Sequence, residues 1–221
     1  MKHKIALIHT GPVLLEPLKK LFLEIMPDAE IFNILDDSLL AEVIKDGKVS
    51  KKIIKKMCYY MLIAEESGAE VILNVCSSVS ETVDIANKIV HVPIIKIDEP
   101  MAELAVKTGR KIGVIATLET TLKPTIRLIE NKATETNKQV SIKSEICQNA
   151  FHELINGNRD RHDEIVSQTI IKLSHDVDLI VLAQGSMAVL GEKMENTIKI
   201  PILTSPRSGV KRVRDILNSL K

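Results

Sequence analysis

The side chains best suited to acid–base or nucleophilic chemistry in this chain are its three cysteines, Cys58, Cys76 and Cys147. Their odd number and the lack of any CxxC spacing argue against a disulfide scaffold and against a cysteine-rich zinc site. The six histidines are scattered, without HxH or HExxH spacing, so we expect no metal site. Free thiols fit a reducing compartment, and we therefore expect a cytoplasmic protein.

Cys76 has the surroundings of a reactive thiol. It ends an apolar run and precedes Ser77 and Ser78, which can cap a following helix. The partial positive charge at a helix N-terminus stabilises a thiolate, so its pKa can fall well below about 8.5. We predict that Cys76 is a base or nucleophile near neutral pH; the alternative is a buried cysteine at a strand end. Cys58, in an apolar helical pattern, is predicted to be core, and Cys147 lacks a partner motif.

Small hydroxyl side chains gather where strands are predicted to end. Hydroxyls and backbone N–H groups at helix starts suit a carboxylate or phosphate, so we predict an anion-binding site, with helix capping as the alternative for some members. Arg207, within residues 204–209, can add a bidentate contact to a ligand carboxylate or be a surface arginine. The hydroxyl set comprises Thr10, Ser77, Ser78, Thr117, Thr120, Thr121 and Ser186.

These side chains are carried by alternating strands and helices. Apolar runs predict short strands, and helical spacing of apolar residues predicts a helix over 14–25 and a helix pair around the turn at residues 46–47. Strands that alternate with helices are typical of parallel sheets covered on both faces. The predicted strands are residues 5–8, 31–35, 70–75, 93–97, 111–116, 140–146, 178–183 and 201–204.

The two halves of the chain resemble each other. Residues 4–10 match residues 111–117 at a spacing of 107 positions, and residues 70–78 match residues 178–186 at a spacing of 108. The next prolines, Pro93 and Pro201, keep the spacing of 108. We therefore predict an α/β fold of two pseudo-symmetric Rossmann-like subdomains, each a parallel sheet flanked by helices, with the site in the cleft between them.

The repeat also predicts the boundaries and the site. Residues 1–97 with 206–221 are expected to form one subdomain, and residues 98–205 the other. Ligands of open parallel sheets bind outside the carboxyl ends of the strands. Those ends carry Thr10, Cys76, Thr117 and Gln184.

Composition excludes several classes of partner. The 221 residues include 30 Lys plus Arg and 29 Asp plus Glu, and only 2% are aromatic, so we expect no nucleic-acid partner and no binding to anionic membranes. No apolar run approaches the roughly 18 residues that span a bilayer, and residues 5–8 are too short for a signal peptide. The basic stretch 45–56 is interpreted as a solvated helix face. Neither GxGxxG nor GxxxxGK[ST] occurs, so no nucleotide cofactor is expected.

Four segments together resemble the aspartate/glutamate/hydantoin racemase superfamily, over nearly the whole chain. Residues 74–78 (Asn-Val-Cys-Ser-Ser) look like the family's first catalytic-cysteine loop, and residues 113–117 with Thr120 and Thr121 look like its substrate loop. Residues 182–188 (Leu-Ala-Gln-Gly-Ser-Met-Ala) resemble the second cysteine loop, and residues 201–209 resemble its closing Ser-Pro-Arg turn. The resemblance implies an isomerase that works without pyridoxal phosphate or another cofactor, uses two cysteines on opposite faces of an acidic α-carbon, and forms a cytosolic homo-oligomer, often a dimer.

The chain departs from this pattern at Gln184, which stands where the family has its second cysteine. An amide does not exchange a proton at neutral pH, although it can hydrogen-bond a carboxylate or an enolate. Two-base racemisation is therefore not expected unless a further acid takes part. We interpret the chain as an enzyme in which Cys76 is the sole catalytic thiol, while Gln184, Gly185, Arg207 and the hydroxyl set hold a small carboxylate.

Several reactions remain open at this level. One-sided proton transfer, decarboxylation and isomerisation all fit a single thiol, and covalent attack by Cys76 on an unsaturated diacid is a further possibility. A non-enzymatic small-molecule binding protein is the third interpretation. The reactivity of Cys76 discriminates among them, because a low thiol pKa favours an enzyme and an inert thiol favours binding alone.

Overall fold

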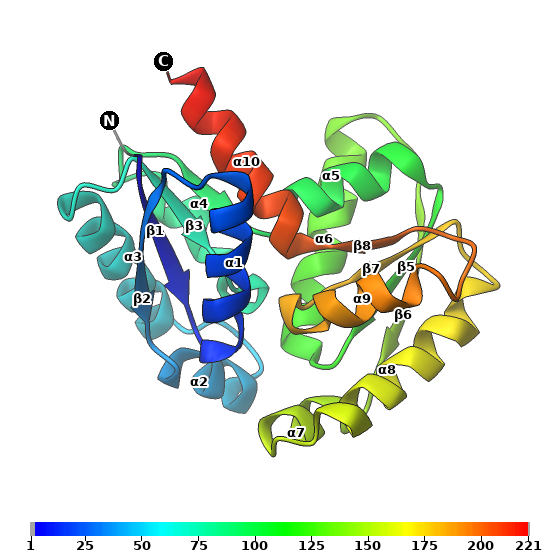
Figure 1. Ribbon diagram of the computed structural model, residues 1–221. Coiled ribbons are helices and arrows are strands. Elements are labelled where there is room, and N and C mark those ends of the chain that lie inside the picture. The colour runs from blue at the N-terminus through cyan, green and yellow to red at the C-terminus, as the bar shows by residue number, and fades with distance from the viewer. Residues whose placement is uncertain (1–2, 221) are drawn as a thin grey trace. The chain divides into compact units, whose positions relative to one another are not determined.

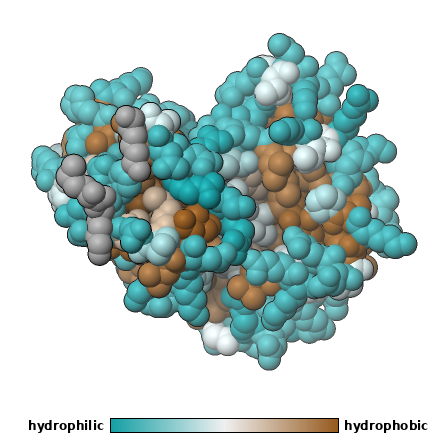
Figure 2. All heavy atoms as spheres, turned by 45° about the horizontal axis from the view of Figure 1, so that its top comes forward, coloured by the Kyte–Doolittle hydropathy of each residue, from teal (hydrophilic) through white to brown (hydrophobic). Residues whose placement is uncertain are grey.

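All strands of the computed structural model, which describes residues 3–220, lie in two four-stranded sheets, and every strand pair is parallel (Figure 1). The chain divides into two compact units. Unit 1 holds the residues up to Ile97 and those from Pro206 on, and unit 2 holds Asp98–Ser205. Hydrophilic residues cover most of the face shown in Figure 2, with hydrophobic areas between them.

The sheet of unit 1 has the strand order β2-β1-β3-β4. Its two central strands are apolar on both faces and are buried along almost their whole length, as expected for a parallel sheet covered by helices on both sides. Edge strand β2 alternates between half-buried and exposed positions. The strands are β1 (Lys4–His9), β2 (Glu30–Leu35), β3 (Val71–Asn74) and β4 (Ile94–Lys96).

Helices cover both faces of this sheet, and the pleat of the strands decides which side chains each face contributes. Ala6 and Ile8 of β1 pack with α2, α3 and α4, whereas Ile5 and Leu7 pack with α1 and α10. These helices are α1 (Leu15–Ile25), α2 (Ser38–Asp46), α3 (Lys51–Glu66), α4 (Thr82–Ala86) and α10 (Ser205–Ser219). The 3₁₀ turns η1 (Pro12–Leu14) and η2 (Ser77–Val79) follow β1 and β3.

The turn between α2 and α3 follows from local sequence. Gly47 ends α2 in the left-handed region, with φ of 66°, where a residue without Cβ is not strained. Ser50 then caps α3, because its Oγ accepts a hydrogen bond from the backbone N–H of Ile53 at 3.2 Å. The predicted helix pair is therefore present, with its turn at the predicted position.

The sheet of unit 2 has the strand order β6-β5-β7-β8. Numbered within each unit, this is the same 2-1-3-4 order as in unit 1. Its central strands β5 and β7 are again buried on both faces. The strands are β5 (Lys111–Ala116), β6 (Ser141–Ile146), β7 (Leu179–Leu182) and β8 (Ile202–Thr204).

The helices of unit 2 repeat the layering of unit 1. Ile115, Ile180 and Leu182 pack with α7, α8 and α9, and Ile112, Val114 and Val181 pack with α5 and α6 on the other face. The helices are α5 (Glu99–Thr108), α6 (Glu119–Glu135), α7 (Ala150–Ile155), α8 (Arg159–Ser174) and α9 (Ala188–Met194), and the 3₁₀ turn η3 (Gly185–Met187) follows β7.

Two helices, α5 and α10, each follow the last strand of one sheet and pack on the other sheet. α5 follows β4 of unit 1 but packs on the sheet of unit 2, and α10 follows β8 of unit 2 but packs on the sheet of unit 1. The approach of α10 is close at Gly209, where a Cβ would lie 2.7 Å from Ile97 Cγ1 and 3.0 Å from the Ile97 carbonyl oxygen. Glycine is therefore required at this point of the contact.

The predicted fold class is confirmed, since two four-stranded parallel sheets are flanked by helices. Five of the eight strands are shorter than predicted by one residue at one or both ends, β1 and β2 are longer than predicted, and β5 has the predicted bounds. The predicted helix over 14–25 corresponds to α1, with its first residue in the preceding turn η1. Among the described residues, no helix combines the length and the apolar character needed to cross a membrane.

Candidate functional site

At the carboxyl edge of the unit 1 sheet, Thr10 and Cys76 are neighbours. β1 and β3 pair with Ile8 opposite Asn74, so the chain positions two residues further on also lie side by side. The Thr10 hydroxyl makes a hydrogen bond with the Cys76 thiol. The Asn74 side chain, which is buried, donates to the Cys76 carbonyl oxygen at 3.1 Å and holds the backbone of the cysteine in place.

Cys76 is partly exposed as a residue, and its thiol is surrounded by hydrogen-bond donors. Besides the Thr10 hydroxyl, Ser78 and the backbone N–H of Val79, both in η2, make hydrogen bonds with it. Ser77 and Ser78, the two predicted ligand-binding serines of this loop, are buried. Thr10 and Ser78 thus contact the thiol, and a role of Thr10, Ser77 and Ser78 in substrate binding stays a prediction.

The expected low pKa of the Cys76 thiol is wrong. Burial raises the pKa of the thiol, and the hydrogen bonds from Thr10, Ser78 and Val79 lower it by less. Burial of the thiol is the main physical reason, and the element that follows does little to oppose it. η2 is a three-residue 3₁₀ turn and not a long helix, so it offers N–H groups but little of the dipole expected from a helix N-terminus. The neutral thiol is therefore the resting form of Cys76.

At the carboxyl edge of the unit 2 sheet, Thr117 and Gln184 take the equivalent positions. β5 and β7 pair with Ile115 opposite Leu182. The Gln184 Oε1 accepts two hydrogen bonds from Thr117, one from its backbone N–H at 2.6 Å and one from its hydroxyl at 3.0 Å. A backbone N–H can only donate, so the amide oxygen of Gln184 faces Thr117.

This arrangement orients the other end of the Gln184 amide. Its Nε2 group makes no hydrogen bond within residues 3–220, and the side chain is only partly buried. An amide nitrogen donates and does not accept. Gln184 therefore presents a hydrogen-bond donor, and no proton-exchanging group, at the edge of the sheet.

The remaining predicted site residues of unit 2 lie in the same two loops. Thr120 and Thr121 are in the first turn of α6, and Thr121 is buried. The Thr120 Oγ1 atom is buried without a hydrogen-bond partner within the described part of the chain. Gly185 and Ser186 form the start of η3 and are partly exposed. Thr120 thus has an unused hydroxyl at the N-terminus of a long helix, which suits a carboxylate oxygen.

Arg207 makes the predicted kind of contact, but its partner belongs to the same chain. In the first turn of α10, its Nη1 and Nη2 atoms lie 2.7 Å and 2.9 Å from the two carboxylate oxygens of Glu24 in α1. The guanidinium holds the pKa of Glu24 below its usual value. Both side chains are exposed, and a role of Arg207 in ligand binding stays a prediction.

Two features of the unit 1 edge were not predicted as functional. His9, next to Thr10, is buried; its Nε2 lies 2.9 Å from Asn33 Oδ1, and its Nδ1 has no partner in the described chain. Burial lowers the pKa of His9, which keeps the ring neutral near pH 7. In the sequence, His9 is marked only by its position directly before Thr10. That position does not distinguish a residue of the binding site from a residue that supports the fold.

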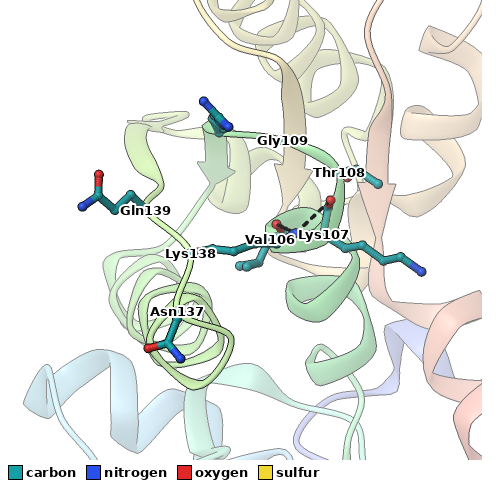
Figure 3. A pocket seen from close by; sticks show the side chains of 8 residues that line it. Val106, Lys107, Thr108, Gly109, Asn137, Lys138 and Gln139 are labelled. Atoms are coloured by element: carbon teal, nitrogen blue, oxygen red, sulfur yellow. Dashed lines mark hydrogen bonds between the residues drawn. The ribbon is translucent and has the colours of Figure 1, made fainter.

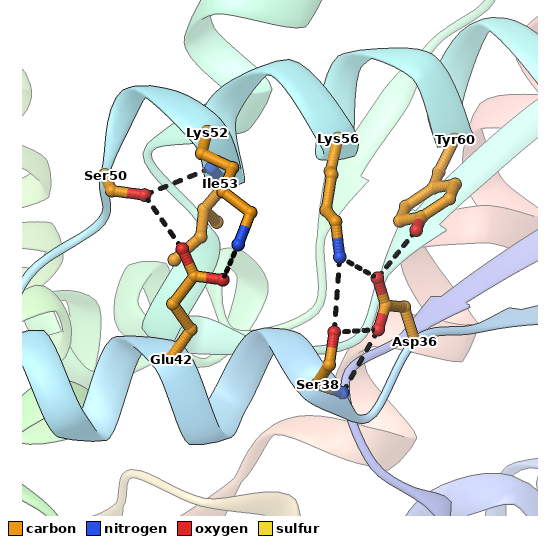
Figure 4. Close-up of polar contacts among 8 residues, drawn as sticks. All are labelled: Asp36, Ser38, Glu42, Ser50, Lys52, Ile53, Lys56 and Tyr60. Carbon is orange, nitrogen blue, oxygen red and sulfur yellow. Dashed lines mark hydrogen bonds and ion pairs between the residues drawn. The ribbon is translucent and has the colours of Figure 1, made fainter.

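The second feature is a polar network around Asp36, which follows β2 (Figure 4). The Asp36 carboxylate accepts hydrogen bonds from Tyr60 at 2.6 Å and from Lys56 at 3.0 Å, both in α3, and from Ser38 at the start of α2. Despite partial burial, these bonds hold the pKa of Asp36 well below its usual range, and Asp36 raises the pKa of Tyr60 to about 12. The network joins the loop after β2 to two helices.

A groove of about 590 Å³ lies at the opposite, amino edge of the unit 2 sheet (Figure 3). It is lined by residues that precede β5 and β6 and includes Arg110 and Gln139. Lys138 Nζ donates there to the backbone carbonyls of Val106 and Lys107 at 3.1 Å and 3.2 Å, at the end of α5. This groove is separate from Thr117 and Gln184, and its lysine stabilises a helix end.

Within the residues that the structure describes, no group of three or more His, Cys, Asp or Glu side chains is arranged to hold a metal ion. Cys147 is buried, and its thiol bonds the Thr169 hydroxyl at 3.3 Å. Cys58 lies in α3 and is buried in the core of unit 1. Of the three cysteines, Cys76 is the one that is not fully buried.

The sequence pattern of the Asp/Glu/Hydantoin racemase family matches residues 14–213. The chain therefore belongs to this family. The match spans both units, including the loops that carry Cys76 and Gln184. A search of the curated proteins finds no match.

Solved structures with the same fold include racemases. Allantoin racemase from Klebsiella pneumoniae matches with a TM-score of 0.75 and 16% identity, over 99% of this chain and 89% of that one. Glutamate racemase isoform RacE1 from Bacillus anthracis matches with a TM-score of 0.78 and 18% identity, over 98% of this chain and 82% of that one. An aspartate racemase homologue from Pyrococcus horikoshii matches with a TM-score of 0.74 and 19% identity, over 99% of this chain and all of that one. At these identities the likeness concerns the fold.

Proposed function

We propose that this member of the racemase family is a cofactor-independent enzyme that acts on a small carboxylate, with Cys76 as its only catalytic thiol. The observation that carries the proposal is the pair of equivalent edges. Each unit has a threonine bonded to the residue that follows its third strand, but that residue is a thiol in one unit and an amide in the other. One acid–base group and one fixed donor fit one-sided proton transfer.

The neutral resting thiol indicates the direction of the transfer. A thiol with a raised pKa delivers a proton to a carbanion or enolate, and the thiolate then left behind accepts hydrogen bonds from Thr10 and from the η2 amide of Val79. The same thiolate can remove a proton from the carbon next to a carboxylate. Isomerisation and racemisation require both proton removal by the thiolate and proton delivery by the thiol. Decarboxylation requires only proton delivery by the thiol.

The loops of unit 2 would bind the oxygens of the substrate. Gln184 Nε2 donates a hydrogen bond to a carboxylate or enolate oxygen, and Thr117 orients it. The Thr120 hydroxyl and the serine of the Gly185–Ser186 segment are further donors. That Cys76 and Gln184 contact the same ligand is a prediction from the sequence repeat and from family membership.

Two other functions are the alternatives. A decarboxylase, or a cis–trans isomerase of a small diacid, is favoured by the raised pKa of Cys76 and by the amide at position 184. A catalytically inactive small-molecule binding protein is favoured by the same raised pKa, since a neutral thiol is a poor nucleophile. A homo-oligomeric state and a cytoplasmic location are further parts of the proposal, and size-exclusion chromatography with light scattering tests the first of them.

Proton NMR in D₂O with a panel of small carboxylates tests the proposal. The panel contains aspartate, glutamate, hydantoins, maleate and substituted malonates, so that solvent exchange, isomerisation and decarboxylation each produce a distinct spectrum. We expect one of these reactions in the wild type, and a loss of about 10²- to 10⁴-fold in Cys76→Ala. Cys147→Ala is the matched control, because the Cys147 thiol is buried and its hydrogen bond goes to Thr169 in α8, so this variant should retain activity.

Equal activity of wild type and Cys76→Ala would contradict the role of the thiol. A wild type that is silent across the panel, with Cys76 also resistant to alkylation, would favour the binding protein. Equal loss in both cysteine variants would point to a fault in folding, which the thermal unfolding midpoint reports.

A further inference from the structure

The loop that carries Gln184 is held from a helix that the sequence did not connect with the site. Arg159, in the first turn of α8, donates from Nη2 to the Ser186 carbonyl oxygen at 2.8 Å. Ser186 lies in η3, two residues after Gln184. The contact joins residues 27 positions apart in the chain and is a charged donor on a backbone acceptor.

Asp163 fixes the orientation of Arg159 from one turn further along α8. Its Oδ1 atom lies 3.1 Å from Arg159 Nε, and the same atom lies 2.7 Å from Nδ1 of His162, which is fully buried. The Nε atom thus faces Asp163 while an Nη atom faces the loop. Because the guanidinium is planar, occupying Nε restricts where the Nη atoms point.

The loop is then held at both ends. At one end Gln184 is bonded to Thr117, and at the other the Ser186 carbonyl is bonded to Arg159. The turn is closed by the Met187 N–H, which donates to the Gln184 carbonyl oxygen at 3.0 Å. A short turn with both of these points fixed has little freedom to move the Gln184 amide.

We propose that Arg159, oriented by Asp163, is a positioning residue that holds the Gln184–Ser186 loop in its binding geometry. The effect on turnover rests on the proposed function, but the effect on the loop does not. Arg159 touches the loop backbone, so it acts through Gln184 and not on the substrate. A displacement of about 1 Å in a binding group costs much of the rate, which is why such a residue matters.

Hydrogen exchange measured by mass spectrometry tests the proposal on the whole chain. In Arg159→Ala we expect the peptide that covers residues 184–187 to exchange about tenfold faster or more, because the turn around the Met187 amide opens more often. Arg159→Lys restores part of the protection, and Asp163→Asn gives an intermediate effect. Arg161→Ala is the matched control, since Arg161 lies in the same helix, pairs with Glu164 at 2.6 Å and does not contact the loop.

Wild-type exchange of the 184–187 peptide in a folded Arg159→Ala protein would overturn the proposal. Faster exchange spread equally over α7 and α8 would also overturn it, because Arg159 would then be a general stability element. Once a substrate is found, kcat/KM in Arg159→Ala is expected to fall about tenfold, while Cys76 alkylates at the wild-type rate. An unchanged kcat/KM with a loosened loop would refute the positioning role. A wild type without any turnover contradicts the proposed function and leaves the exchange result valid.

Discussion

The carboxyl edges of the two sheets have the same construction and different chemistry. In unit 1 Thr10 is bonded to a thiol that burial keeps protonated, and in unit 2 Thr117 is bonded to an amide whose oxygen it occupies with two donors. The repeat therefore preserved the threonine and the strand order, while the residue after the third strand changed. In the proposed function, the thiol supplies the acid–base group and the amide supplies a fixed donor.

The edges differ again after the second strand of each unit. Asp36 N–H donates to the His9 carbonyl at 3.1 Å, and Cys147 N–H donates to the Ala116 carbonyl at 2.8 Å, so the two residues are structural equivalents. The Asp36 carboxylate is bonded to Lys56 and Tyr60, whereas the Cys147 thiol is bonded to the Thr169 hydroxyl on the corresponding helix α8. At this position, unit 1 links its second strand to a helix through a charged carboxylate. Unit 2 makes the equivalent link through a neutral, buried thiol.

The largest expected effect comes from giving Gln184 a charge. In Gln184→Glu, Thr117 still donates to one oxygen, but the outward donor becomes an acceptor that repels a ligand carboxylate. We expect ligand affinity to fall about 10- to 100-fold, the worth of a hydrogen bond to a charged group. Isothermal titration with the carboxylate found in the NMR panel measures it. Gln139→Glu adds the same charge at the opposite edge of the same sheet and should bind as the wild type does.

The next effect concerns stability and the pair Asp36 and Cys147. Asp36→Asn is expected to lower the free energy of unfolding by about 2 kcal/mol, because a largely buried carboxylate loses charge-assisted bonds to Lys56 and Tyr60. Cys147→Ala removes one weak bond and a small side chain, at about 1 kcal/mol. Urea unfolding at neutral pH measures the free energy of unfolding of both variants. A larger decrease in Cys147→Ala than in Asp36→Asn would contradict the stronger contribution assigned to the Asp36 network.

The sign of the pH dependence follows from the lowered pKa of Asp36. A carboxyl group with a depressed pKa in the folded state stabilises the fold above its unfolded pKa, and the contribution disappears as the pH falls toward the folded pKa. The difference between wild type and Asp36→Asn should therefore be constant above about pH 5 and shrink below about pH 4. A difference that grows on acidification would exclude the network as its source.

The smallest effect distinguishes the two threonines. Removing the Thr10 hydroxyl in Thr10→Val deletes a bond that lowers the pKa of the Cys76 thiol, so less thiolate is present at a given pH. Iodoacetamide should then alkylate Cys76 a few-fold more slowly, and in both proteins the rate should rise about tenfold per pH unit while the thiol is mainly protonated. Thr117→Val, whose hydroxyl bonds Gln184, should alkylate as the wild type does. Site-resolved mass spectrometry gives the rates.

The sequence by itself determined the layered fold and the positions of most loops. Apolar runs such as residues 5–8 and 111–116 predict buried strands where they alternate with helical patterns, and the repeat at 107–108 positions predicts the same strand order twice. It also placed Thr10, Cys76, Thr117 and Gln184 at the carboxyl ends of predicted strands. The strand pairing of the structure then brings Thr10 next to Cys76 and Thr117 next to Gln184.

Only the tertiary structure decided the electrostatics and the long-range contacts. The raised pKa of Cys76 depends on how much of the thiol is buried and on the short 3₁₀ turn after it, and neither follows from its neighbours in the chain. Arg207 pairs with Glu24, 183 positions away, and the Arg159 contact to Ser186 spans helix α8 and strand β7. Local periodicity specifies which residues form an element and which face is apolar, whereas a pKa or a side-chain hydrogen bond depends on groups that only the packing of those elements brings together.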